Sequence, residues 1–129
     1  MNALLDTDIL IDHLRGEEQA RSLLLDLALA EQPPAISVIT VAEIEAGLRD
    51  AERAQVEALL SSLQSLTVDA AIARLAGRYR MALGKSHSVL LPDALIAATA
   101  LQHEKTLYTM NQKHYPMAEL EVIVPYQKA

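Results

Sequence analysis

The stretch Ala3-Leu4-Leu5-Asp6-Thr7-Asp8 decides the fold, because a short apolar run ends abruptly in two carboxylates. The apolar run predicts a buried strand, and the polar residues end it at a turn into a helix. In open parallel α/β sheets, functional groups gather at the carboxyl ends of the strands. Asp6 and Asp8 therefore stand where a site is expected.

The rest of the chain alternates in the same way between short apolar runs and helical segments. We expect strands at Ala3–Leu5, Ala35–Val38, Leu66–Val68, Thr106–Thr109 and Glu121–Val124. We expect helices from Asp8 or Ile9 to about Leu14, Glu17 to about Glu31, Thr40–Arg49, Glu52–Leu63, Asp69–Leu83 and Asp93–His103. Short apolar strands separated by helices predict a three-layer α/β/α domain with a short parallel sheet of about five strands.

Three local signals mark helix starts. Thr40 and Glu43 have the spacing of a capping box. Asp69 is a candidate N-cap for the long helix that follows it, and Pro92 suits a first helical position with Asp93 in the first turn. The last of these helices is apolar nearly all round, so we expect it to be buried.

Composition bounds the class of protein. The chain has 129 residues, which corresponds to a single domain spanning 1–129, and 51% of them are hydrophobic, which excludes disorder as the main state. The absence of cysteine excludes a disulfide scaffold, a cysteine zinc site and thiol catalysis. With no apolar run near the ~18 residues of a membrane span and no basic leader, we expect a soluble cytoplasmic protein.

Charge is unevenly distributed along the chain. The net charge of −6 argues at first sight against a nucleic-acid partner. Residues 1–69 carry 13 acids and 4 bases, however, whereas residues 70–129 carry 4 acids and 7 bases. Every charged residue between 70 and 92 is basic: Arg74, Arg78, Arg80 and Lys85. A polyanion would meet a locally basic surface if these side chains share a face.

Four distant segments are expected to place oxygen ligands at one edge of the sheet. Those ligands are Asp6 and Asp8, Glu43, Asp93, and Thr109 with Asn111. Converging carboxylates repel one another, and a divalent cation removes that cost. An all-oxygen set favours Mg²⁺, with Mn²⁺ as a substitute, and metal-assisted phosphodiester hydrolysis is the reaction that fits.

Each of these residues also has a plainer interpretation. Asp6 and Asp8 can cap the first helix, and Glu43 can be the far partner of the Thr40 capping box. Asp93 can serve only the helix dipole, and Asn111 can be a turn residue. From spacing alone, both interpretations stay open.

Four stretches, taken together, resemble a known family. They are 4–11 (LLDTDILI), 36–48 (ISVITVAEIEAGL), 91–98 (LPDALIAA) and 107–115 (LYTMNQKHY). In this order the chain resembles the PIN-domain ribonucleases, and most closely the VapC-type toxins of toxin–antitoxin pairs. The resemblance implies metal-dependent cleavage of RNA that leaves a 5′-phosphate and a 3′-hydroxyl.

The resemblance implies roles for particular residues. Asp6, Glu43 and Asp93 match the acidic metal-site residues, and Asn111 matches a fourth catalytic position at which many relatives carry an acid. The supporting positions are Thr7 and Thr109, whose hydroxyls orient acids or phosphate, and Asp8, which either adds a carboxylate to the site or caps the helix. Candidates for gripping the RNA backbone are Arg78, Arg80, Lys85 and Lys113.

Aromatic residues for base recognition are few. The chain contains four tyrosines and no Trp or Phe. Tyr79 and Tyr115 are the candidates for stacking on RNA bases, whereas packing is the expected use of Tyr108 and Tyr126. No role is assigned to His114.

The resemblance also implies partners, namely a second copy of the chain and a cognate VapB-type antitoxin whose C-terminal segment covers the groove. An apolar stripe offers surface for that segment, although it can equally be ordinary core: Ile44, Leu48, Val56, Leu59, Leu60 and Leu63. Two alternatives within the fold are a housekeeping nuclease of RNA maturation and an inactive binding module. A phospho-acceptor receiver domain fits poorly, because the expected fifth strand ends in Val124-Pro125, without the Lys that such a domain needs there.

Overall fold

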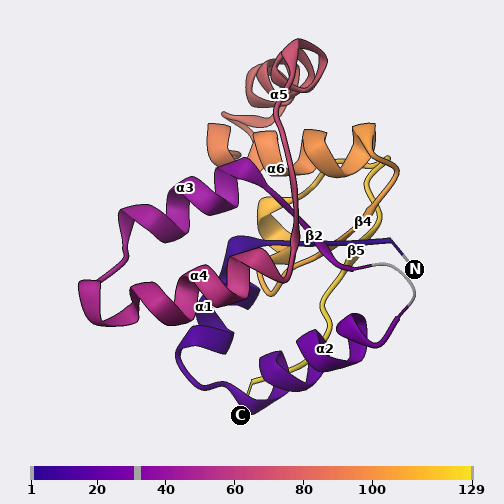
Figure 1. The fold of residues 1–129 in the computed structure, drawn as a ribbon. Coiled ribbons are helices and arrows are strands. Elements are labelled where there is room, and N and C mark those ends of the chain that lie inside the picture. The colour runs from indigo at the N-terminus through magenta and orange to yellow at the C-terminus, as the bar shows by residue number, and fades with distance from the viewer. Residues whose placement is uncertain (1, 31–32, 129) are drawn as a thin grey trace.

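Five short strands form one sheet in the order β3-β2-β1-β4-β5, and every neighbouring pair is parallel (Figure 1). The structure is a computed structural model that describes residues 2–30 and 33–128. The strands are β1 (Ala3–Leu5), β2 (Ala35–Ser37), β3 (Gln64–Leu66), β4 (Thr106–Tyr108) and β5 (Val122–Ile123). The predicted parallel sheet of about five strands is confirmed.

In the part of the chain that the structure describes, six helices and two short 3₁₀ turns surround the sheet. The helices are α1 (Thr7–Leu14), α2 (Glu18–Ala28), α3 (Val38–Ala46), α4 (Arg53–Ser61), α5 (Ala70–Leu83) and α6 (Leu91–Gln102). The 3₁₀ turns are η1 (Asp50–Glu52) and η2 (Gln112–His114). In Figure 1, α3 and α4 extend together to one side of the sheet, whereas α5 and α6 lie above it.

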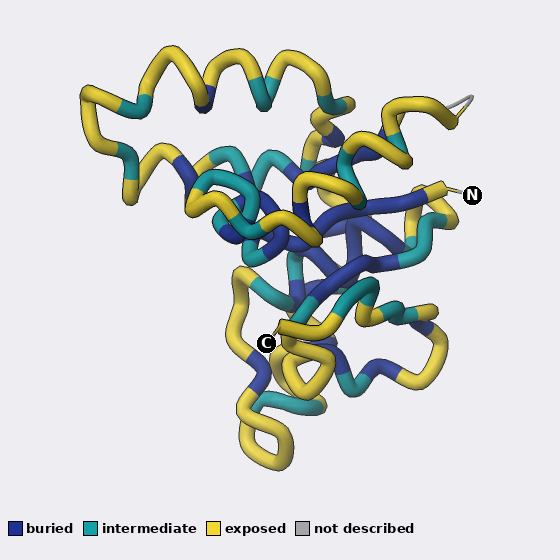
Figure 2. The backbone as a smooth tube through the Cα atoms, turned by 90° about the horizontal axis from the view of Figure 1, so that it is seen from below, coloured by how far each residue is buried: buried dark blue, intermediate teal, exposed yellow. Residues whose placement is uncertain are grey.

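The core lies on the two faces of the sheet, because successive strand residues point to opposite sides. Leu4 of β1 packs with α5 and α6, while its neighbours Ala3 and Leu5 pack with α1 and α2. Helix α6 is the most deeply buried helix, as its apolar composition predicted. Figure 2 shows the buried residues running through the middle of the molecule, with exposed residues on the outer helices. The three-layer α/β/α arrangement is therefore confirmed.

The start of α3 differs from the prediction. Val38 was expected to end the second strand, but it is the first residue of α3, and the cap is Ser37, whose Oγ accepts from the Ile39 backbone N–H at 3.1 Å. Thr40 is therefore inside the helix and fully buried. The predicted capping box between Thr40 and Glu43 is wrong.

The third strand is also shifted. It was expected at Leu66–Val68, but Gln64 pairs with Ala35, and Leu66 pairs with Ser37. β3 is an edge strand that exposes its first two residues, so its polar sequence carried no apolar signal. The second helix ends at Ala28, and the expected end at Glu31 lies outside the described residues. Within the described residues, no helix is long and apolar enough to cross a membrane.

Candidate active site

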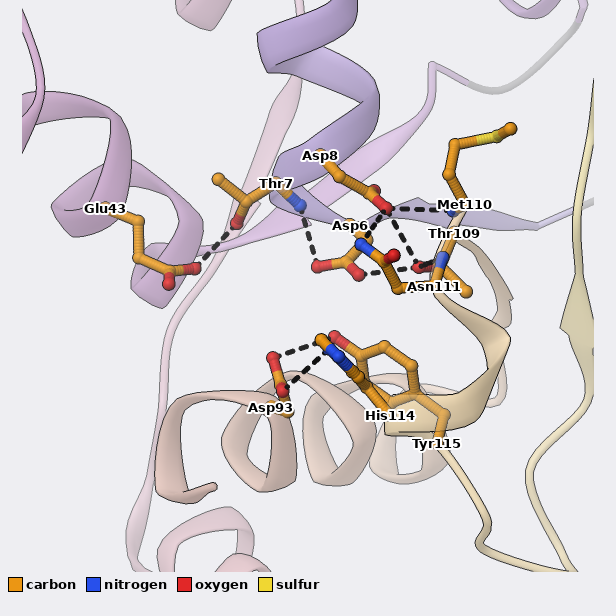
Figure 3. Close-up of polar contacts among 10 residues, drawn as sticks. All are labelled: Asp6, Thr7, Asp8, Glu43, Asp93, Thr109, Met110, Asn111, His114 and Tyr115. Atoms are coloured by element: carbon orange, nitrogen blue, oxygen red, sulfur yellow. Dashed lines mark hydrogen bonds and ion pairs between the residues drawn. The ribbon is translucent and has the colours of Figure 1, made fainter. Parts of the chain in front are cut away.

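Asp6 lies at the carboxyl edge of the sheet, and both of its carboxylate oxygens accept hydrogen bonds. It follows β1 directly and is 6% exposed. Its Oδ1 accepts from the backbone N–H of Thr7 at 2.8 Å, which makes it the N-cap of α1. Its Oδ2 accepts from the Thr109 hydroxyl at 2.7 Å (Figure 3). Asp6 therefore caps the helix and is also held in one orientation at the edge of the sheet.

Glu43 reaches the same edge from α3. Its Oε1 accepts from the Thr7 hydroxyl at 2.7 Å, and that hydroxyl lies 2.9 Å from the hydroxyl of buried Thr40. The residue itself is exposed. Thr7 therefore links Glu43 to the start of α1, the helix that Asp6 caps.

Asp93 approaches from the opposite side, in the first turn of α6. The Tyr115 hydroxyl donates to its Oδ1 at 3.3 Å, and Nδ1 of His114 lies 3.3 Å from its Oδ2. In Figure 3 the Asp93 carboxylate points from α6 toward Asp6. Helix α6 thus adds a third acid to the site from another part of the fold.

Asp8 is tied to the end of β4 and does not cap the helix. Its Oδ2 accepts from the Met110 backbone N–H at 2.9 Å, from Nδ2 of Asn111 at 3.0 Å and from the Thr109 hydroxyl at 3.3 Å. Its Oδ1 is buried without a hydrogen-bond partner among the described residues. The structure thus brings Asn111 to Asp8, with the amide acting as a donor.

The acids interact electrostatically. Burial, and then the charge of Asp6, raise the pKa of Asp8 to about 6. Burial and Asp6 also raise the pKa of Asp93, with a smaller contribution from Glu43, while His114 and Tyr115 act in the opposite direction. The cluster therefore carries unfavourable negative charge that a cation would relieve.

The carboxylate oxygens of the site suit a hard cation such as Mg²⁺ that is held by few protein ligands. Among residues 2–30 and 33–128, no group of three His, Asp or Glu side chains forms a ready-made metal cage. Mg²⁺ seldom uses one, because it binds through one or two carboxylates and keeps several waters. The buried, unpartnered Oδ1 of Asp8 and the raised pKa values of Asp8 and Asp93 suit such an ion.

The four basic candidates are all exposed. Arg78 and Arg80 lie on α5, which packs against α6, and Lys85 follows that helix. Lys113 lies in η2, next to His114. Their use in RNA binding stays a prediction.

The stacking role expected of Tyr79 and Tyr115 does not fit the structure. The two residues are 9% and 4% exposed and belong to the core cluster against α5 and α6, so neither ring offers a free face. Tyr108 is also buried, and Tyr126 donates its hydroxyl to Oδ2 of Asp12 at 2.7 Å. The hydroxyl of Tyr115 at Asp93 is a site contact that composition and spacing did not indicate.

The apolar stripe is divided between core and groove. Ile44 and Val56 are buried, and the four leucines are partly buried against the same cluster. A pocket lies between α1, α3 and α4, and Glu43 is one of its lining residues. Its apolar lining consists of Ile11, Leu14, Ile44, Leu48 and Val56. The stripe is thus largely core, and only part of it faces the pocket.

Comparisons with known proteins agree with this fold. Residues 3–120 match the PIN domain family, so the chain belongs to that family. Within it, the chain is 44% identical to Ribonuclease VapC10 of Mycobacterium tuberculosis over 117 residues, covering 90% of this chain and 87% of the relative. It is 40% identical to Ribonuclease VapC19 of the same species over 115 residues, covering 88% and 92% of the two chains.

Solved structures give the same result. A toxin–antitoxin complex from Klebsiella pneumoniae superposes with a TM-score of 0.79 at 32% identity, covering 98% of this chain and all of that one. VapBC2 from Rickettsia felis, bound to a DNA fragment from its promoter, superposes with a TM-score of 0.80 at 26% identity, covering 95% and 98%. The resemblance to VapC-type PIN domains is confirmed.

Proposed function

We propose that this chain is a Mg²⁺-dependent endoribonuclease acting as the toxin of a VapBC-type toxin–antitoxin pair. The observation that carries the proposal is the arrangement of Asp6, whose two oxygens are held by Thr7 and Thr109 beside Glu43 and Asp93. The relatives named as VapC ribonucleases supply the class of substrate. A single PIN domain spanning 1–129 is part of the proposal.

In this proposal, Asp6, Glu43 and Asp93 hold Mg²⁺, or Mn²⁺ in its place, directly or through water. When bound, the ion supplies an activated water and positive charge against the charge that develops on the phosphate. Thr109 keeps Asp6 oriented, and Thr7 does the same for Glu43. Asn111 fixes Asp8 at the rim of the site.

The RNA backbone is proposed to lie against the exposed basic residues Arg78, Arg80, Lys85 and Lys113. Because all four tyrosines are buried or engaged in other contacts, we expect selection by RNA shape rather than by base stacking. The distribution of charge supports this division, since Asp6, Asp8 and Glu43 belong to the acidic half of the chain, whereas the basic candidates and Asp93 belong to the other half. We expect the activity to be cytoplasmic.

A VapB-type antitoxin and a homodimer complete the proposal. The pocket between α1, α3 and α4 combines an apolar lining with Glu43 of the site, so a partner segment there would reach the carboxylates. An arginine on that segment would meet several acids at once, which favours a strong charge-assisted hydrogen bond.

The nuclease is tested by mapping RNA cleavage with Mg²⁺ and with EDTA, using Asp6→Asn, Glu43→Gln and Asp93→Asn proteins. We expect all three variants to lose cleavage while remaining folded. Glu45→Gln is the matched control, because Glu45 lies on α3 close to Glu43 but pairs with Arg53 at the surface. Wild-type rates in the three site variants would refute the assignment.

The toxin role needs a separate test in cells. We expect expression of the chain alone to arrest growth, and co-expression of its operon neighbour to restore it. Unimpaired growth with soluble, active nuclease present would favour a housekeeping PIN nuclease without an antitoxin.

A further inference from the structure

Tyr115 places a buried hydroxyl at the edge of the carboxylate cluster. The residue is 4% exposed, and its ring packs in the core cluster with Met117 and Leu120. Its hydroxyl donates to Oδ1 of Asp93 at 3.3 Å and also interacts with the Asp6 side chain. In Figure 3 this hydroxyl lies beside Asp93, on the side toward Asp6.

The surroundings keep this hydroxyl protonated. Burial raises the pKa of Tyr115, and the carboxylates of Asp6 and Asp93 raise it further. The group therefore acts as a hydrogen-bond donor to negative charge. His114 also reaches Asp93, but its side chain is 56% exposed, so water competes for that contact.

The segment from Thr109 to Tyr115 joins the two sides of the site. At its start, Thr109 donates to Asp6, and Asn111 donates to Asp8. At its end, Tyr115 donates to Asp93 on α6. Three side-chain hydrogen bonds from this segment therefore connect the Asp93 carboxylate with the acids at the start of α1.

We propose that Tyr115 is a positioning residue, whose hydroxyl holds Asp93 facing Asp6 so that the two carboxylates are placed for one divalent cation before it binds. The inference rests on the proposed metal-dependent nuclease. Groups that hydrogen-bond to metal ligands orient them, and their loss typically weakens metal affinity or activity by about 10–100-fold.

The test is Mn²⁺ binding by the RNA-free protein, measured by calorimetry and by the electron paramagnetic resonance of free Mn²⁺. Tyr115→Phe keeps the ring and removes the hydroxyl, so we expect the Kd for Mn²⁺ to rise about tenfold. Tyr79→Phe is the matched control, because Tyr79 is another core tyrosine whose hydroxyl contacts Glu119. We expect the control to bind Mn²⁺ like the wild type.

Cleavage assays add a second readout. For Tyr115→Phe we expect the rate to be low at limiting Mg²⁺, to recover at saturating Mg²⁺, and to show an unchanged KM for RNA. Wild-type Mn²⁺ affinity in Tyr115→Phe, or equal weakening in Tyr79→Phe, would overturn the inference and leave the nuclease proposal intact. A wild-type protein that neither binds Mn²⁺ nor cleaves RNA would overturn both.

Discussion

The Thr109 hydroxyl donates to Oδ2 of Asp6 at 2.7 Å, across 103 residues of sequence. The two residues follow β1 and β4, which are paired in the sheet, so the hydrogen bond joins the ends of two neighbouring strands. Both side chains are buried. Sheet pairing thus brings a hydroxyl to the central carboxylate of the proposed active site.

Removing that hydroxyl should impair both stability and activity. Thr109→Val keeps the shape and leaves one oxygen of a buried carboxylate without this donor. We expect a loss of about 1–3 kcal/mol in the free energy of unfolding and a fall in cleavage rate of about tenfold or more. Urea unfolding and RNA cleavage measure the two effects.

Thr99→Val is the control for this change. Thr99 is equally buried, but its hydroxyl donates to the Leu95 carbonyl within α6. We expect near wild-type cleavage from it. A Thr109→Val protein as active as Thr99→Val would show that orientation of Asp6 by Thr109 is unimportant.

The contact between Thr7 and Glu43 gives a second prediction. Thr7→Val removes the donor that holds Oε1 of Glu43 at 2.7 Å, so the acid becomes mobile at the exposed rim. We expect cleavage to fall about tenfold or more, and Thr7→Ser, which keeps the hydroxyl, to retain most of the activity. Equal activity in the Val and Ser variants would contradict this role of Thr7.

The metal-free protein should show a pH dependence that Asp8 causes. The folded-state pKa of Asp8 is about 6, above the 3.8 of an ordinary Asp, so its ionisation opposes folding. The neutral carboxyl of Asp8 therefore contributes to the stability of the fold. This contribution is complete below about pH 4 and is lost as the pH rises through 6. It amounts to on the order of 1–3 kcal/mol.

Asp8→Asn removes this titration. We therefore expect the variant to gain stability relative to the wild type between pH 4 and pH 7.5, measured by urea unfolding in EDTA. The gain should shrink when Mg²⁺ is added, because the cation relieves the same repulsion in the wild type. A difference between the two proteins that is independent of pH would contradict the raised pKa.

The C-terminal segment provides a stability change outside the site. The Tyr126 hydroxyl donates to Oδ2 of Asp12 at 2.7 Å, and Nζ of Lys128 donates to Oδ1 of Asp12 at 2.6 Å. These two hydrogen bonds hold the C-terminal segment against α1. Tyr126→Phe should lower the free energy of unfolding by about 1–2 kcal/mol and leave the cleavage rate unchanged. A large loss of cleavage in a folded Tyr126→Phe protein would show that this contact also serves the site.

The sequence predicted the sheet because most strands are short apolar runs between helices. The predicted bounds of the second and third strands were wrong where the local sequence favoured another structure. The β-branched residues after Ser37 extended the expected strand into α3, and the spacing of Thr40 and Glu43 imitated a capping box. The edge strand Gln64–Leu66 was misplaced because it buries only its last residue.

The site was predictable only in part, for a similar reason. Asp6, Glu43 and Asp93 could be proposed as candidates because each follows an expected strand end or helix start. The partners that orient them depend on tertiary contacts, such as Thr40 beside Thr7 and Tyr115 beside Asp93. No local pattern marks such a contact, so Tyr115 was assigned to base stacking when its ring is buried.

The most direct test of the central claim is the rate of RNA cleavage as a function of Mg²⁺ concentration, measured for the wild type and for Asp6→Asn. We predict that the wild-type rate rises to saturation with Mg²⁺ and vanishes in EDTA, while folded Asp6→Asn protein cleaves at no Mg²⁺ concentration. Cleavage by the wild type that persists unchanged in EDTA, or a wild-type rate in Asp6→Asn, would contradict a metal-dependent site built around Asp6.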